Sequence, residues 1–135
     1  MAQVLGIGGV FFKSNEPKAL GEWYKNWLGV PVEHPWGASF NPKNLPSGAL
    51  GVWNPFDAST SYFQPSTRDY MVNLIVDDLD GAMALVVEGG ATVVGEIEDS
   101  EFGRFGWFVD PEGNKVELWQ PPDDPTGAGP DLSDE

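Results

Sequence analysis

The chain has 135 residues and no cysteine, so it fits a single domain without disulfides, a thiolate metal site or a cysteine nucleophile. Apolar residues make up 41 % and aromatic residues 13 % of the sequence, which excludes a wholly disordered chain. The net charge of -14 would repel phosphate backbones and anionic membrane faces, so neither nucleic acid nor a membrane is an expected partner.

The start of the chain and its apolar runs bear on its location. Residues Met1 to Val4 lack the basic region of a secretory signal, and no apolar run reaches the roughly 18 residues of a membrane span. We therefore expect a cytoplasmic protein. Its acidic balance would attract a cationic ligand, although a requirement for solubility also explains the charge.

The first half of the chain predicts a strand, a helix and several short strands. Strand-like residues run from Val4 to Phe12, and Asn15 is placed to cap the following helix, which Gly29 ends. The apolar face of this helix consists of Leu20, Trp23, Tyr24, Trp27 and Leu28. The segment from Val30 to Phe56 is rich in Pro and Gly and predicts short strands with kinked connections, the clearest over residues 49–54.

A polar linker over about residues 57–69 leads to a second series of elements. Residues Tyr70 to Val76 predict a strand. Asp77 or Asp78 caps a second helix, and glycines from Gly89 end it. The apolar stripe of this helix consists of Leu79, Ala82, Met83, Val86 and Val87.

Three further strands are predicted over residues Thr92 to Ile97, Phe105 to Val109 and Lys115 to Trp119. A tight turn, Asp110 to Asn114, joins the last two. Residues 122–135 are rich in Pro, Gly and Asp and predict a disordered acidic tail.

The same order of elements occurs twice in the chain. The two predicted helices share one spacing of apolar residues, and Val116 to Pro121 aligns with Leu50 to Pro55. The sequence therefore predicts an α+β fold with two βαβββ modules, over about residues 4–56 and 70–121, within one domain of residues 1–121.

Several short strings resemble the vicinal oxygen chelate superfamily, which includes glyoxalase I, extradiol dioxygenases and bleomycin-binding resistance proteins. They are Trp23-Tyr24, Leu28-Gly29, Val76 to Leu79, and Asp110-Pro111-Glu112-Gly113-Asn114 leading into Val116-Glu117-Leu118. The resemblance covers about residues 4–121. It implies curved mixed sheets from the two modules that face each other around a cleft. Members often pair modules between chains, which implies a homodimer.

The resemblance also implies where a metal would be held. Enzymes of the superfamily bind a divalent metal with His or Glu side chains from the first and last strands of each module. Glu117 matches one such position, whereas the others fall on Gly51, on Met71 and on Ile7 or Gly8. One carboxylate cannot hold a hard divalent cation tightly in water, so we expect no metal or other cofactor. The alternative is a divalent metal held by other ligands.

The superfamily turns the Glu117 face of the last strand toward the cleft. If the hairpin pairs Val109 with Val116, Phe108 lies opposite Glu117 on that face. The expected ligand-binding residues are Glu117, Asn73, Met71, Phe108, Trp53, Gly51 and Trp119, with Phe11 and Trp36 at the rim.

Glu117 and Asn73 are the polar members of this set. A carboxylate in an aromatic pocket is a candidate catalytic general base or the partner of a ligand ammonium, unless hydrogen bonds or solvent simply hold it. A buried amide without partners costs about 1 to 3 kcal/mol, so Asn73 bonds either its neighbours or a ligand. His34 lies between Pro31 and Pro35, outside every expected ligand position, and is expected to be a loop residue.

These features predict a metal-free small-molecule-binding protein of the glyoxalase/bleomycin-resistance type, with a cationic or aromatic ligand. The rival is a lyase, isomerase or dioxygenase-like enzyme that uses Glu117 as a base or within a metal site built from other ligands. A third interpretation is a dimeric module with no ligand beyond its partner subunit.

Overall fold

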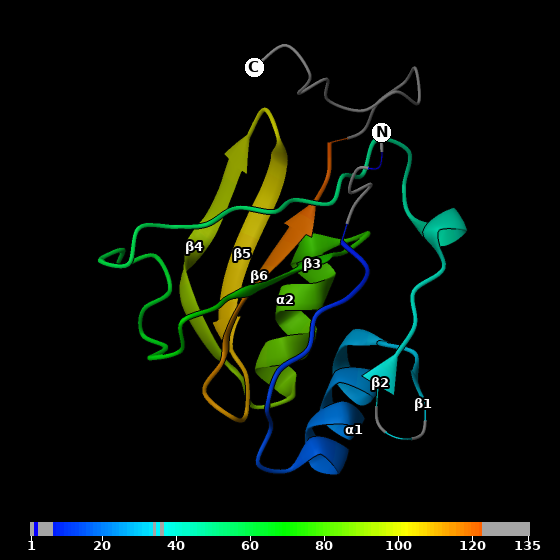
Figure 1. Cartoon of the computed structure of the whole chain (residues 1–135), viewed down its shortest axis with the longest axis vertical. Coiled ribbons are helices and arrows are strands. Elements are labelled where there is room, and N and C mark those ends of the chain that lie inside the picture. Colours follow the sequence, from blue (N-terminus) through cyan, green and yellow to red (C-terminus); the bar gives the residue numbers. More distant parts are fainter. Residues whose placement is uncertain (1, 3–6, 34, 36, 123–135) are drawn as a thin grey trace.

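The computed structural model describes residues 2, 7–33, 35 and 37–122 of the chain. Its second half forms a four-stranded sheet in the order β3-β6-β5-β4 (Figure 1). The strands are β3 (Val72–Ile75), β4 (Thr92–Ser100), β5 (Gly103–Val109) and β6 (Lys115–Gln120). Strand β3 runs parallel to β6, and the other neighbours are antiparallel. With helix α2 (Leu79–Glu88) between β3 and β4, the βαβββ order predicted for the second half is present.

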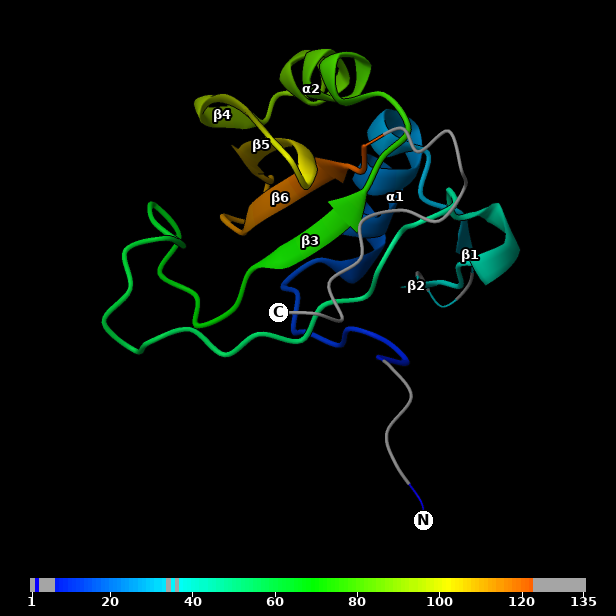
Figure 2. The same cartoon turned by 90° about the horizontal axis from the view of Figure 1, so that it is seen from above.

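Helix α2 covers one face of this sheet, and the segment of residues 50–70 lies on the other side (Figure 2). Asp78 caps the helix, because its carboxylate accepts a hydrogen bond from the backbone N–H of Gly81 at 3.1 Å. Gly106 of β5 allows close packing, since a Cβ there would lie 3.0 Å from the sulfur of Met83. The buried core between helix and sheet consists of Leu79, Ala82, Met83, Val86, Phe108, Val116 and Leu118.

The first half contributes helix α1 (Pro17–Leu28), a hairpin of β1 (Val32–Glu33) and β2 (Gly37–Ala38), and the short 3-10 helix η1 (Pro42–Asn44). Helix α1 packs beside α2. The indole N–H of Trp23 donates to the carbonyl of Gly89 at 2.8 Å. A Cβ on Gly89 would lie 2.7 Å from the ring of Trp27, so this glycine allows the two helices to approach.

The prediction that Asn15 caps α1 is wrong. The N-cap residue is Glu16, and its side chain makes no capping bond. Glu112, in the turn before β6, supplies the cap instead. Its carboxylate accepts from the hydroxyl of Ser14 at 2.6 Å and from the backbone N–H groups of Asn15 and Glu16 at 2.9 and 3.2 Å. The free N–H groups of a helix N-terminus attract a carboxylate from anywhere in the fold, so local sequence did not identify it.

The two-module arrangement is not confirmed, although the α+β class is. Among the described residues, neither 7–12 nor 49–54 forms a strand, so the strand predicted over 49–54 is wrong. A strand needs a neighbour to pair its backbone groups, and strand propensity alone does not provide one. These segments leave large side chains in water instead, with Phe11 96 % and Trp53 80 % exposed.

Several predictions fall on parts of the chain that the structure does not describe. Residues 3–6 of the first predicted strand, His34, Trp36 and residues 123–135 of the predicted tail lie outside the described residues. Within the described part of the chain, no helix has the length and apolar character needed to cross a membrane.

Candidate functional site

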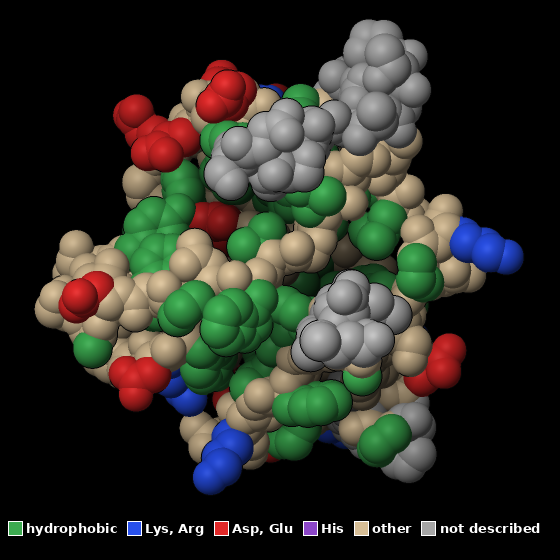
Figure 3. All heavy atoms as spheres, turned by 45° about the horizontal axis from the view of Figure 1, so that its top comes forward, with side chains coloured by type: hydrophobic (Ala, Val, Ile, Leu, Met, Phe, Trp, Pro, Cys, Tyr) green, Lys and Arg blue, Asp and Glu red, His purple; other side chains and the backbone are tan. Residues whose placement is uncertain are grey.

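An open groove with a volume of about 1810 Å³ lies on the sheet face that α2 leaves uncovered. Strands β3, β5 and β6 form its floor, and residues 50–58 and 60–71 form much of its wall. Figure 3 shows hydrophobic side chains gathered around a hollow on this side of the molecule, with most charged side chains toward the outline. The groove is therefore largely apolar, with polar groups concentrated at a few points.

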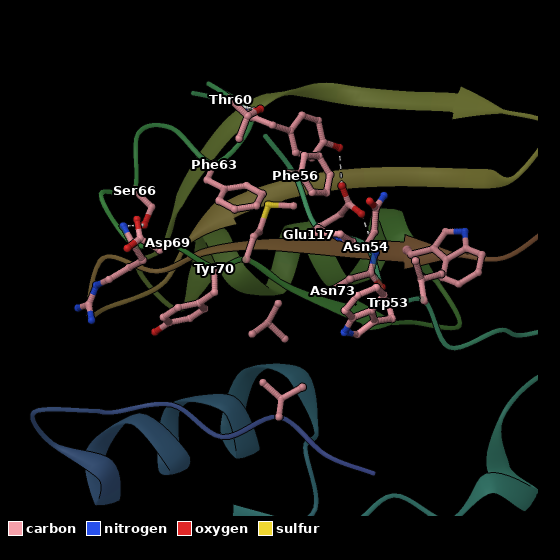
Figure 4. A pocket seen from close by; sticks show the side chains of 18 of the residues that line it. Trp53, Asn54, Phe56, Thr60, Phe63, Ser66, Asp69, Tyr70, Asn73 and Glu117 are labelled. Carbon is pink, nitrogen blue, oxygen red and sulfur yellow. Dashed lines mark hydrogen bonds between the residues drawn. The ribbon is translucent and has the colours of Figure 1, made fainter. Parts of the chain in front are cut away.

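The register of three neighbouring strands places one carboxylate between two donors on the groove floor. Glu117 of β6 lies opposite Asn73 of β3 and opposite Trp107 of β5. The amide of Asn73 donates to Glu117 Oε1 at 2.6 Å (Figure 4). The indole N–H of Trp107 donates to Oε2 at 2.8 Å. The first alternative for Asn73, a bond to its neighbours, therefore holds.

A third donor reaches Glu117 from the linker that crosses the groove. The hydroxyl of Tyr62 donates to Glu117 Oε2 at 2.6 Å, and the Tyr62 carbonyl accepts from the ammonium of Lys115 at 2.5 Å. That ammonium lies 5.1 Å from the centroid of the Tyr62 ring and 5.9 Å from that of Trp107. Glu117 is thus held by three hydrogen bonds, with a buried cation close by.

Burial shifts the pKa values of Tyr62 and Lys115, the two titratable neighbours of Glu117 described above. Burial raises the pKa of the Tyr62 phenol, and the hydrogen bond to Glu117 raises it further, so Tyr62 remains a protonated donor. Burial lowers the pKa of Lys115, and the charge of Glu117 partly opposes this effect. The charge of Glu117 therefore favours the ammonium form of Lys115.

The turn before β6 fixes the position of Glu117 along its strand. The carboxylate of Asp110 accepts from the backbone N–H and the side-chain amide of Asn114, and from the hydroxyl of Tyr24 at 2.8 Å. The hydroxyl of Tyr70 donates to Asn114 at 3.0 Å. Burial and the nearby Asp110 raise the pKa of the Tyr24 phenol, which keeps it a donor. These bonds tie the turn to α1 and to the residues before β3.

Most of the predicted site residues that the structure describes lie around this groove. They are Phe11, Gly51, Trp53, Met71, Asn73, Glu117 and Trp119. Their part in binding stays a prediction. Trp36 lies outside the described residues.

The placement of Phe108 in the cleft is wrong. Phe108 pairs with Val116, is 0 % exposed, and has its ring centroid 5.8 Å from that of Trp23 in the core. The hairpin pairs Val109 with Lys115 rather than with Val116, and a shift of one residue exchanges the two faces of a strand. Trp107 occupies the place expected for Phe108.

Three groups beside Glu117 were not predicted. The two-residue period of β5 and β6 could have indicated Trp107 and Lys115, because they lie on the face of Glu117. Tyr62 belongs to a segment without helix or strand, and nothing in the sequence indicated that it would reach the carboxylate.

The residues at the superfamily's four metal positions do not fit a metal site of that type. Ile7, Gly51, Met71 and Glu117 all line the groove, and only the last has a side chain suited to a hard divalent cation. The oxygens of Glu117 already accept three hydrogen bonds. Elsewhere in the described residues there is no group of three or more His, Cys, Asp or Glu placed to bind a metal. That the protein works without a cofactor remains a prediction.

Comparison with known proteins identifies the family. A family model described as a glyoxalase-like domain matches residues 9–119. The chain belongs to this glyoxalase-like family. This family model confirms the resemblance to the vicinal oxygen chelate superfamily. No curated protein matches the chain.

Several solved structures are similar to this chain. A member of the glyoxalase/bleomycin resistance protein/dioxygenase superfamily from Sphaerobacter thermophilus DSM 20745 shares 25 % identity over 89 % of this chain and 98 % of that chain, with a TM-score of 0.47. TnmS3, an antibiotic binding protein from Streptomyces sp. CB03234, shares 25 % identity over 81 % and 88 % of the two chains, with a TM-score of 0.47. A protein of unknown function from Agrobacterium tumefaciens str. C58 shares 16 % identity over 88 % and 96 %, with a TM-score of 0.52, a likeness of fold alone.

Proposed function

We propose that this glyoxalase-like protein binds a small, neutral organic ligand with an aromatic surface in the groove, without the help of a metal. The observation that carries the proposal is the replacement of metal-binding side chains by Ile7, Gly51 and Met71 around a groove rich in aromatic residues. The groove's volume of about 1810 Å³ leaves room for a drug-sized molecule.

The aromatic side chains of the groove supply the binding surface. Trp53 is 80 % exposed and Phe56 is 44 % exposed, and both line the groove. Burial of apolar surface contributes roughly 25 cal/mol per Å², so covering about 100 Å² of such rings contributes about 2.5 kcal/mol. A planar ligand that lies against one of these rings would gain stacking energy as well.

The polar groups of the groove favour a neutral ligand over a cationic one. Glu117 is the carboxylate that a cation would seek, but Lys115 lies beside it and three protein donors bond it. A second positive charge would gain little there and would meet the ammonium of Lys115. The cationic ligand predicted from the sequence charge is therefore the less favoured alternative.

The same hydrogen bonds weigh against the enzymatic alternative. A general base needs an acceptor position for the substrate proton, and Oε2 of Glu117 already accepts from Tyr62 and Trp107. Oε1 accepts from Asn73 and keeps one further acceptor position. That position suits a ligand donor, and we propose no reaction.

A homodimer is the second part of the proposal. Phe11 and Val52 are exposed in segments that pair with no strand among the residues that the structure describes. A second copy would cover part of this apolar surface and leave the groove between subunits. Analytical ultracentrifugation should show a dimer at micromolar concentration, whereas a concentration-independent monomer would remove this part of the proposal.

The binding proposal is tested with quinoline and its permanently charged analogue N-methylquinolinium. Both are titrated into the protein while tryptophan fluorescence is recorded, for the wild type and for Trp53→Ala. The matched control is Trp27→Phe, which also removes one indole but lies at the α1–α2 contact. We expect saturable quenching by quinoline that Trp53→Ala weakens and Trp27→Phe leaves unchanged.

Two results would count against the binding proposal. The binding proposal loses its support if quenching does not saturate at millimolar quinoline, or if quenching is the same in the wild type and in Trp53→Ala. Tight, near-stoichiometric binding of Mn, Ni, Fe or Zn by the purified protein would overturn its metal-free part.

A further inference from the structure

Tyr62 of the linker occupies a part of the groove in the way a ligand would. Its ring is stacked on Phe56, with centroids 5.6 Å apart and planes 17° apart. The same ring meets Trp107 edge-on, with centroids 6.2 Å apart. Its hydroxyl donates to Glu117 at 2.6 Å, and the ammonium of Lys115 lies over its face. The protein thus surrounds one phenol ring with stacking, edge and hydrogen-bonding contacts.

The middle of the linker, residues 57–67, is hydrogen-bonded to the sheet through Tyr62, and Arg68 near its end donates to the carbonyl of Glu112 at 3.2 Å. Within residues 57–67, the other hydrogen bonds are local turns, such as those from Thr60 to Asp57 and from Gln64 to Ser61. Tyr62 alone in this range bonds to the sheet, through its hydroxyl and its carbonyl. A hydrogen bond contributes only a small net stability to a folded protein, because water offers each partner an alternative. A ligand that replaces these contacts can therefore displace Tyr62.

Tyr62 is also placed where exchange with a ligand is feasible. Its side chain is 39 % exposed, and Glu117 and Tyr62 both line the groove. Once Tyr62 leaves, Oε2 of Glu117 keeps the indole N–H of Trp107 and lacks its second donor. The vacated space then fits a planar ring whose hydroxyl points at that oxygen.

The chemistry of the surrounding groups selects the ligand. The cation of Lys115 favours an electron-rich ring face. The carboxylate of Glu117 requires a donor and repels an anion, which excludes carboxylates and phenolates in this position. A neutral phenol meets both requirements.

We propose that Tyr62 fills a phenol subsite of the groove, and that a ligand with a phenolic hydroxyl displaces Tyr62 and bonds Glu117 in its place. This inference rests on the proposed binding function and adds the ligand class and the residue that competes with it. Tyr62 then acts as an internal competitor that any ligand of this subsite must outcompete.

The first experiment compares the wild type with Tyr62→Phe, which keeps the ring and removes only the hydroxyl. The probe is 4-methylphenol, and the readout is the NMR resonance of the Trp107 indole N–H, which shares an acceptor oxygen with Tyr62. Because the competing ring loses its hydrogen bond, we expect 4-methylphenol to bind about 2- to 10-fold more tightly to Tyr62→Phe. Equal affinities for the two proteins would overturn the proposal.

The second experiment empties the subsite with Tyr62→Ala and tests whether Glu117 recognises the hydroxyl. The probes are 4-methylphenol and 1,4-dimethylbenzene, which has the same shape and no donor. Adding Glu117→Gln to this variant replaces a charged acceptor with a neutral one. We expect it to weaken 4-methylphenol about fivefold and to leave 1,4-dimethylbenzene unchanged.

The outcomes separate this inference from the broader proposal. If quinoline binds the wild type but the affinity for 4-methylphenol does not depend on Glu117, the phenol subsite is overturned and the binding function stands. If neither quinoline nor 4-methylphenol binds, both are overturned. Should Tyr62→Ala fail to fold, the comparison with Tyr62→Phe still decides the question.

Discussion

Replacing Glu117 by alanine and by glutamine should have very different effects on stability. Alanine removes the acceptor for three donors. Trp107 is 7 % exposed, and a buried N–H without an acceptor costs about 1 to 3 kcal/mol. Tyr62 and Asn73 are exposed enough to bond water and should add less than about 1 kcal/mol each. We expect Glu117→Ala to lower the free energy of unfolding by about 2 to 4 kcal/mol.

Glutamine keeps most of these bonds. Its amide oxygen can accept from both Trp107 and Tyr62, and its NH₂ can donate to Asn73 once that amide turns its oxygen inward. The substitution removes the negative charge beside the ammonium of Lys115. The loss in the free energy of unfolding should therefore stay at about 1 kcal/mol.

Urea unfolding followed by circular dichroism measures both variants. The matched control is a double variant that combines Asn73→Asp with Glu117→Gln. It moves the negative charge from β6 to the neighbouring strand β3. This pair should be more stable than Asn73→Asp alone, in which two carboxylates would lie within contact distance. The reasoning is refuted if glutamine is as costly as alanine, or if alanine costs less than 1 kcal/mol.

Three further outcomes follow from other parts of the structure. Glu112→Ala should cost about 1 kcal/mol as the loss of a helix cap. The hydrogen bond from Ser14 is the main cause that holds the pKa of Glu112 below its ordinary 4.5, so this stabilisation is complete above that pH and lost as the pH falls through the folded-state pKa. The free energy of unfolding of Glu112→Ala should differ less from that of the wild type at pH 3 than at pH 7. An equal difference at both pH values would contradict the capping role. Trp53→Ala should change the free energy of unfolding by less than about 0.5 kcal/mol, because the side chain is 80 % exposed, and a larger loss would mean that it packs in the fold. Gly103→Ala should cost about 2 to 3 kcal/mol, because φ is 118° there and a Cβ would strike the carbonyl of Gln120; a thermal shift near zero would show that the β5–β6 packing can relax.

The register of one hairpin shows how much of the site was predictable. The period of two along β6 grouped the residues that share a face with Glu117, and the resemblance to the superfamily indicated that this face is the open one, which the structure bears out. Its partner across the hairpin depended on the length of the connecting loop. The loop of residues 110–114 is one residue shorter than the expected pairing of Val109 with Val116 required, and this places Trp107 opposite Glu117 instead of Phe108. Alternation is a local property of a strand, whereas register is settled by the turn.

Local patterns in the sequence determined both helices and all four strands of the main sheet. The apolar stripes, Asp78 as a cap and Gly29 as a stop act within a few residues of where they stand, so they predict α1 and α2 without knowledge of the fold. The glycine-bearing turn after Asp110 acts in the same local way.

Tertiary structure alone decided which distant groups meet. Glu112 caps a helix from the other half of the chain, and Tyr62 reaches Glu117 from a segment with no regular structure. Residues 49–54 have the composition of a strand but find no neighbour to pair with among the described residues. In each case a backbone group or a carboxylate needs a hydrogen-bond partner. The whole fold, rather than the neighbouring residues in sequence, decides which group lies close enough to be that partner.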